Sequence, residues 1–353
     1  MARVMADQGD DLLARLIVKA GEPMTAAAAP EPRATTVLEA VGVPSALEID
    51  EGSSARTPAK GPPEGMPRRL GRYEVLGEIG AGAAGIVLEG TDPELCRKVA
   101  IKVLRHEHAD RELIERFVSE AQVTAQLEHP GIVPIHDFGI TPDGRLYLVM
   151  KRVYGRSLLE ILGELAQGDE ATAREWSVQR RLGAFVQLCR AVGYAHDRGV
   201  VHRDLKPSNL MFGAFGEALV MDWGIARVMK SAAVPVDRWN THNTAEGRVM
   251  GTPGYMSPEQ MLGAQAQLGA PSDVWSLGVI LYEVLTVQRA FRGTYDEISA
   301  RVTAGPLTTD EFPPTHVPVA LGQIVRTATN VMTGQRYANA ARLADAIDAC
   351  FGR

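Results

Sequence analysis

The chain has 353 residues and a formal net charge of -6, with 45% hydrophobic and 23% charged residues, which is ordinary for a globular protein. The acidic balance argues against nucleic-acid binding, which usually needs a basic surface, and no apolar run approaches the ~18 residues of a membrane span. Three widely spaced cysteines argue against a disulfide framework and favour a cytoplasmic location.

The first 70 residues differ in composition from the rest of the chain. They contain an alanine run and several stretches rich in Gly, Pro and Ser, so they bury little apolar surface, and we expect a flexible N-terminal extension. Within it, residues 10–21 begin with acids and end at glycine, with Leu12, Leu13, Leu16 and Ile17 on one helix face. This segment is either a transient helix in a tail or a docking helix.

From Tyr73 onward the pattern becomes that of a folded domain. Strands are predicted at residues 73–77, 86–90, 98–104, 135–138 and 146–150, with one amphipathic helix over residues 110–127. After Gly155 the 3.6-residue period of helices dominates, over residues 158–166, 181–198, 272–287 and 318–351. The chain is therefore expected to be α+β, with a small five-stranded part followed by a mostly helical part.

A glycine-rich turn lies between the first two predicted strands. Gly80, Gly82 and Gly85 fit the pattern G-x-G-x-x-G-x-V, which ends at Val87. Dinucleotide-binding folds use similar glycines, but there the loop enters a helix. The β-branched Ile86 and Val87 favour re-entry into a strand, so a hairpin covering phosphates is predicted, with a simple β-turn as the alternative.

Three further motifs follow in order. They are Val99-Ala100-Ile101-Lys102, His202-Arg203-Asp204-Leu205-Lys206-Pro207-Ser208-Asn209 and Asp222-Trp223-Gly224. Together with the glycine loop they resemble the eukaryotic-type (Hanks-type) serine/threonine protein kinases of bacteria. The resemblance covers residues 71–351 and implies a two-lobed, protein-kinase-like fold with ATP between the lobes. The β-rich N-lobe with one main helix would span about residues 71–150, the hinge 151–155 and the helical C-lobe 156–353.

The resemblance implies transfer of the γ-phosphoryl group of Mg-ATP to Ser or Thr hydroxyls of proteins, with Mn²⁺ as an alternative ion. Asp204 would be the catalytic base, Lys206 would neutralise the γ-phosphate and Lys102 would bind the α- and β-phosphates. Asn209 and Asp222 would hold the metal ion, because hard oxygen ligands suit Mg²⁺. The implied nucleotide-binding residues are Gly80, Gly82, Gly85, Val87, Ala100, Lys102, Glu120, Met150 and Val153.

Some of these positions have rivals or depart from the family pattern. Glu120 is favoured as the partner of Lys102 because Glu-Ala before the segment 127–133 matches the family, but Glu112, Glu115 and Glu128 are local rivals. The departures are Ala84 at the glycine-loop tip, Lys151 and Arg152 in the hinge, Trp223 for Phe and Ser257 for Ala. None of them removes a backbone contact or a catalytic group.

The resemblance also implies supporting residues. Thr252 would contact Asp204 and Lys206, Glu259 would pair with Arg336, and Asp273 would brace the catalytic loop. Arg203, with Arg227, would bind a phosphate on Thr241 or Thr244, which implies self-phosphorylation, with a homodimer as partner. A pseudokinase scaffold should lack Lys102, Asp204, Asn209 or Asp222, and a small-molecule phosphotransferase should lack Lys206 and the segment 252–259. All of these are present.

Overall fold

The computed structural model describes residues 62–63, 65–81, 85–104, 111–141, 143–229, 251–310, 312 and 316–351. The expected extension up to residue 61, the segment 10–21, Gly82, Thr241 and Thr244 lie outside the described residues. Those described fall into two compact units, the first within residues 1–115 and 135–152 and the second within residues 116–134 and 153–353. Helix α3 (Arg111–Gln126) contributes residues to both.

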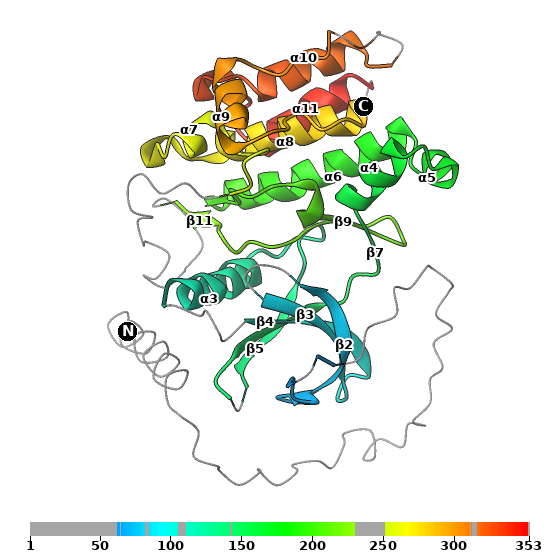
Figure 1. Cartoon of the computed structure of the whole chain (residues 1–353), viewed down its shortest axis with the longest axis vertical. Helices are drawn as coiled ribbons and strands as arrows, with labels where there is room; N and C mark the ends of the chain where they lie inside the picture. The colour runs from blue at the N-terminus through cyan, green and yellow to red at the C-terminus, as the bar shows by residue number, and fades with distance from the viewer. Residues whose placement is uncertain are drawn as a thin grey trace, which may run out of the picture. The chain divides into compact units, whose positions relative to one another are not determined.

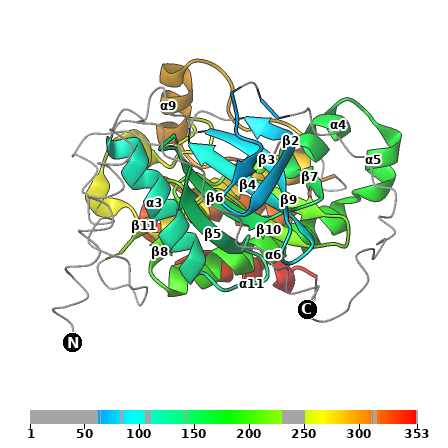
Figure 2. The same ribbon diagram turned by 90° about the horizontal axis from the view of Figure 1, so that it is seen from below.

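The first unit is built on one antiparallel sheet, whose strands lie in the order β1-β2-β3-β4-β6-β5 (Figure 2). The strands are β1 (Arg69–Leu70), β2 (Tyr73–Ala81), β3 (Gly85–Asp92), β4 (Arg97–Leu104), β5 (Ile135–Ile140) and β6 (Leu146–Lys151). The expectation of five strands missed the two-residue β1, which pairs with the start of β2. Two residues are too few to show a period of alternation.

Alternating side chains of β4 hold this sheet to its core. Val99, Ile101 and Val103 are at most 1% exposed, whereas Lys98 is exposed and Lys102 is half-buried. This alternation puts one face of β4 into a cluster that includes Leu70, Tyr73 and Leu88. Each large apolar side chain buried in this way contributes about 1.5–3 kcal/mol.

The second unit is mostly helical (Figure 1). Besides the C-terminal part of α3, its α-helices are α4 (Leu158–Ala166), α5 (Glu170–Glu175), α6 (Val178–Asp197), α7 (Pro258–Met261), α8 (Ala270–Thr286), α9 (Tyr295–Ala304), α10 (Val319–Ala328) and α11 (Ala340–Ala349). Its short strands are β7 (Gly155–Ser157), β8 (Val200–Val201), β9 (Leu210–Gly213), β10 (Ala218–Val220) and β11 (Arg227–Val228). No helix in the described ranges has the length and apolar character needed to cross a membrane.

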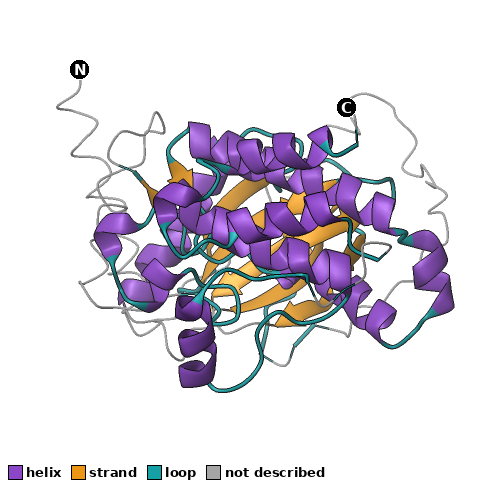
Figure 3. Cartoon of the chain, turned by 90° about the horizontal axis from the view of Figure 1, so that it is seen from above, coloured by secondary structure: helices purple, strands orange, loops and turns teal. Residues whose placement is uncertain are grey.

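Helix α8 is the centre of the second unit. All its residues from Ser272 to Thr286 are buried, including the charged Asp273 and Glu283, so the helix is enclosed on every side. It packs against α6, α10 and α11. Figure 3 shows the helices, in purple, that make up most of this unit. A Cβ added at Gly278 would come within 2.7 Å of the Ala328 Cβ, so glycine lets α10 approach closely. A polar group on α8 is therefore held rigidly and shielded from water.

The order of elements puts the sequence motifs near this helix. Helix α6 leads through β8 into the loop that starts at His202, and the antiparallel β9–β10 pair then leads to Asp222. The Met221 N–H donates to the Asn209 carbonyl at 2.8 Å. The two motifs are thus joined by backbone hydrogen bonds within one unit.

Candidate active site

A buried carboxylate on α8 fixes the backbone at the start of residues 202–209, the expected catalytic loop. Asp273 accepts hydrogen bonds from the His202 N–H and the Arg203 N–H, both at 2.8 Å. Its side chain is fully buried, and such a charge is tolerated only when it is paired and hydrogen-bonded. Burial favours a higher pKa for the Asp273 carboxyl, but the hydrogen bond from His196 and the nearby donors outweigh it and lower the pKa. Asp273 is therefore an ionised anchor.

His196 was not singled out by the sequence interpretation. It lies in the last turn of α6, where its Nε2 is 2.8 Å from Asp273 Oδ2 and its Nδ1 accepts from the Ala340 N–H at 3.3 Å. An Nδ1 that accepts leaves the proton on Nε2, which then donates to Asp273. The sequence carries no signal for this role, because a buried packing histidine has the same surroundings in sequence.

Asp204 lies at the centre of the loop with both carboxylate oxygens engaged. The Thr252 hydroxyl donates to Oδ1 at 2.8 Å, and the Lys206 ammonium donates to Oδ2 at 2.6 Å. Lys206 also donates to Thr252 Oγ1 at 3.0 Å, which closes a three-membered network. The Asp204 side chain is 16% exposed, so a ligand can still reach it. This network holds a carboxylate and an ammonium side by side in fixed geometry.

The two expected metal ligands lie at the same end of the antiparallel β9–β10 pair, Asn209 just before β9 and Asp222 just after β10. The Asn209 side-chain N–H donates to the Asp204 carbonyl at 3.0 Å, and this orients the amide and its oxygen. Asp222 is exposed and has φ 58°, a left-handed conformation that is uncommon outside glycine. Next to it, Trp223 is 2% exposed and its ring lies 4.6 Å from that of His202.

The chemistry of these donors fits Mg²⁺. Within the described part of the chain, no three or more His, Cys, Asp or Glu side chains cluster in a way that could hold a metal ion by themselves. A carboxylate and an amide oxygen without such a cluster match an ion that keeps several waters and binds substrate phosphates. Asn209 and Asp222 therefore suit an ion that arrives with a nucleotide.

Glu120 on α3 is 6% exposed and lies close to Asp222 and Gly224. A Cβ at Gly224 would be 3.1 Å from Glu120 Oε2 and 3.2 Å from Asp222 Oδ1. A side chain at this position would press on both carboxylates, and glycine avoids these tight contacts.

The expected nucleotide-binding residues of the first unit share neighbouring positions on its sheet. Gly80 pairs with Val87 across β2 and β3, and Val87 pairs with Lys102 across β3 and β4. Ala100 pairs with Met150 across β4 and β6. Gly85 lies at the start of β3, where a Cβ would meet the Val103 carbonyl oxygen at 2.3 Å. Val153, also expected at this site, is buried in the second unit.

Arg203 lies in a group of cations. Burial lowers the pKa of its guanidinium to about 10, with further lowering by Arg227 and Arg116 and opposition from Asp273. Its Nε donates to the Ile225 carbonyl at 2.5 Å, so the side chain is held in place. The positive charges of Arg203, Arg227 and Arg116 repel one another, and an anion bound among these side chains would relieve the repulsion.

Glu259 and Arg336 form a buried, two-pronged ion pair. Two Arg336 nitrogens donate to the two carboxylate oxygens, each at 2.8 Å, and the Ser272 hydroxyl donates to Oε1 at 2.7 Å. Both side chains are at most 2% exposed. Burial favours a higher pKa for the Glu259 carboxyl, but Arg336 outweighs it and the pKa is lowered. The pair anchors α7 to the segment after α10.

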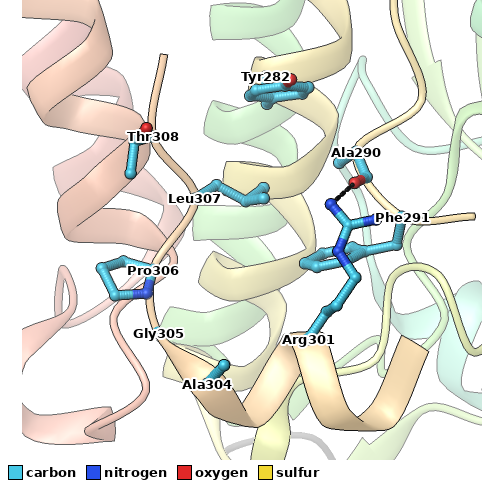
Figure 4. A pocket seen from close by; sticks show the side chains of 9 residues that line it. All are labelled: Tyr282, Ala290, Phe291, Arg301, Ala304, Gly305, Pro306, Leu307 and Thr308. Atoms are coloured by element: carbon cyan, nitrogen blue, oxygen red, sulfur yellow. Dashed lines mark hydrogen bonds between the residues drawn. The ribbon is translucent and has the colours of Figure 1, made fainter. Parts of the chain in front are cut away.

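A hollow of about 440 Å³ lies elsewhere in the second unit (Figure 4). It is lined by residues of α8, α9 and the segments beside them: Tyr282, Ala290, Phe291, Arg301, Ala304, Gly305, Pro306, Leu307 and Thr308. Arg301 crosses it to donate to the Ala290 carbonyl at 3.2 Å. None of the expected catalytic residues lines this hollow, so it is not part of the candidate active site.

Comparisons with known proteins agree with this geometry. Residues 73–336 match the family model described as the protein kinase domain. The chain is 36% identical over 292 residues to the serine/threonine-protein kinase PknD of Chlamydia felis, covering 78% of this chain and 31% of that protein. It is 37% identical over 247 residues to the PknD of Protochlamydia amoebophila, covering 66% and 25%. The chain spans less than a third of the length of these relatives, and it belongs to the protein kinase family.

Proposed function

We propose that this chain is a serine/threonine protein kinase that transfers the γ-phosphoryl group of Mg-ATP to Ser and Thr hydroxyls of proteins. The observation that carries the proposal is the network in which Asp204 receives one hydrogen bond from Lys206 and one from Thr252. The PknD relatives are named as serine/threonine kinases, which supports the same substrate class.

The chemistry follows from the charges of this network. Asp204 orients the substrate hydroxyl and accepts its proton late in the transfer, while Lys206 offsets negative charge on the γ-phosphate. Asn209 and Asp222 would hold Mg²⁺, which supplies charge neutralisation at the phosphates when bound. Most of the rate enhancement comes from positioning and electrostatics. The hold of the Asp273 carboxylate on the backbone of His202 and Arg203 is therefore part of the mechanism.

Binding of ATP would use the residues that the sequence predicts for it. In the first unit, Gly80, Gly82 and Gly85 would offer backbone N–H groups to phosphate oxygens and Lys102 would bind the α- and β-phosphates. Glu120 would orient Lys102. Val87, Ala100, Met150 and Val153 would surround the adenine. The pairing of Gly80, Val87 and Lys102 across adjacent strands supports this assignment for the first unit.

Regulation would act through the cations around Arg203. A phosphate on Thr241 or Thr244 adds about 1.5–2 negative charges and three acceptor oxygens. Arg203 and Arg227 would bind it, and self-phosphorylation within a homodimer would supply it. The support is the lowered pKa of Arg203, which its burial and the neighbouring arginines cause.

The test is a direct assay of the whole chain. Purified protein is incubated with radiolabelled ATP, Mg²⁺ and a library of peptides containing Ser, Thr or Tyr, and mass spectrometry locates the phosphate. We expect label on Ser and Thr, none on Tyr, and none with Asp204→Asn. Label that is equal in wild type and Asp204→Asn would contradict the proposal.

A further inference from the structure

The backbone of Arg203 adopts a conformation that must be enforced. Its φ is 69°, in the left-handed region that costs a non-glycine residue of order 1 kcal/mol. Arg203 directly precedes Asp204, so the peptide group between them sets the direction in which the Asp204 side chain leaves the backbone. Because a peptide group is planar, fixing its carbonyl oxygen also fixes the N–H of the next residue.

The two sides of Arg203 are held by different elements. On the N-terminal side, Asp273 of α8 accepts from the Arg203 N–H at 2.8 Å. On the C-terminal side, the Gln260 side-chain N–H donates to the Arg203 carbonyl at 2.8 Å. The Asp204 N–H itself faces His202 Nδ1 at the longer distance of 3.3 Å. Gln260 therefore makes the short contact on the peptide that joins Arg203 to Asp204.

Gln260 is also held at its other end. Its Oε1 accepts from the Ser257 N–H and the Ser257 hydroxyl, both at 3.1 Å, so donor and acceptor of one amide are used together. The residue is 4% exposed, and water does not compete for these bonds. The preceding residue, Glu259, is clamped by Arg336. The amide thus links a rigid anchor to the catalytic loop.

We propose that Gln260 is a positioning residue that orients Asp204 through the Arg203 carbonyl and so links the end of the segment 251–259 to catalysis. The proposal rests on the proposed kinase function. The side chain at this position must donate to the Arg203 carbonyl and accept from Ser257. No other side chain of similar size does both, because an ionised glutamate has no donor and a methionine has neither an N–H donor nor an oxygen acceptor. Ionised glutamate would also set a negative charge against the Arg203 carbonyl oxygen.

The main experiment compares Gln260→Glu and Gln260→Ala with wild type in the full-length chain. The matched control is Gln267→Glu, which makes the same change of charge at an exposed position of the next short helix, Gln265–Gln267. We expect kcat to fall about tenfold or more in both Gln260 variants while KM for ATP stays within about twofold, since both variants lose the hydrogen bond to the Arg203 carbonyl. Gln267→Glu should match wild type.

The pH dependence of kcat separates positioning from general damage. In Gln260→Glu a protonated carboxyl can donate to the Arg203 carbonyl, and an ionised one cannot; burial raises the pKa of such a carboxyl. The ratio of the Gln260→Glu kcat to the wild-type kcat should therefore rise about threefold or more between pH 8 and pH 6, whereas Gln260→Ala should show a flat ratio. A flat ratio for Gln260→Glu, or near-normal kcat in Gln260→Ala, would overturn the proposal.

A second readout does not depend on kinase activity. Amide hydrogen exchange of the peptide containing residues 201–206 should be faster in Gln260→Ala than in wild type, with no change in Gln267→Glu. Thermal midpoints are measured for all variants, and exchange is compared well below them. Unchanged exchange of residues 201–206 in Gln260→Ala contradicts the positioning role, even if the wild-type chain proves inactive as a kinase. If wild type is inactive but exchange is faster in Gln260→Ala, only the kinase function is refuted.

Discussion

The Thr252 hydroxyl donates a 2.8 Å hydrogen bond to Asp204 Oδ1, although 48 positions separate the two residues in the sequence. The same hydroxyl accepts from the Lys206 ammonium at 3.0 Å. One side chain of the segment 251–259 therefore completes the network around the proposed base. The position of that segment and the geometry of Asp204 are linked by this bond.

Removal of the Thr252 hydroxyl should slow phosphoryl transfer. In Thr252→Val the side chain keeps its shape, but Asp204 and Lys206 each lose their hydrogen bond to the Thr252 hydroxyl, so we expect kcat to fall about tenfold. Thr252→Ser keeps the hydroxyl and should stay within about threefold of wild type. Initial rates on a serine peptide give the comparison. Equal rates for the Val and Ser variants would show that the hydroxyl has no role.

Asp204→Asn and Asp222→Ala should separate chemistry from nucleotide binding. Asp204→Asn removes the proposed proton acceptor and should lower kcat by about 100-fold or more while ATP still binds. Asp222→Ala removes a proposed ligand of Mg²⁺, so calorimetry should show weaker binding of ATP in the presence of Mg²⁺ and a smaller effect without it. Strong Mg-ATP binding by Asp222→Ala would exclude that residue as a metal ligand.

Breaking the Glu259–Arg336 pair should destabilise the fold. A buried ion pair that loses one member leaves an uncompensated charge, so Arg336→Met should lower the free energy of unfolding by about 3–5 kcal/mol. The double variant with Glu259→Met removes both charges and should be more stable than Arg336→Met alone. Urea unfolding of the single and double variants measures this, with Arg174→Met at an exposed helix pair as the control. A double variant less stable than the single one would contradict the argument.

The same pair should make stability depend on acid. The pKa of Glu259 is lowered in the folded protein, so its contribution is complete above its usual value of 4.5 and is lost as the pH falls through the lower folded-state pKa. The difference in stability between wild type and Glu259→Gln should thus be constant from pH 7 to pH 5 and shrink below about pH 4.5. Urea midpoints at pH 7, 5, 4 and 3.5 test this. A difference that grows in acid would mean that the carboxyl is protonated in the fold.

The proposed phosphate switch makes a kinetic prediction. After phosphatase treatment, wild type incubated with ATP should show a lag and then activate, whereas the double variant Thr241→Ala, Thr244→Ala should stay at its starting rate. Arg203→Gln should also fail to activate. Peptide phosphorylation against time, with phosphate mapped by mass spectrometry, measures the lag. Full activation of the double variant would place the switch elsewhere.

The sequence by itself determined the family and the local order of the site. Asp204, Lys206, Asn209 and Asp222 lie within 19 positions of one another, so short-range spacing was enough to predict them as one group. The glycine loop was likewise predicted from its glycine spacing and the β-branched Ile86 and Val87, and the strand 98–104 that contains Lys102 from its local composition. The fold class and the protein kinase family follow from these local patterns together, and the family match confirms both.

Only the tertiary structure decided how the catalytic loop is held. His196 contacts Asp273 across 77 positions and Gln260 contacts Arg203 across 57, and neither contact has a signal in the sequence around it. The left-handed conformation of Arg203 was missed for the same reason, whereas β1 was missed because two residues are too few to show alternation. Periodicity reports whether a residue is buried but not which distant group it meets. The distant partner is decided by tertiary packing. When α8 packs among α6, α10 and α11, it brings Asp273 to the backbone of His202 and Arg203.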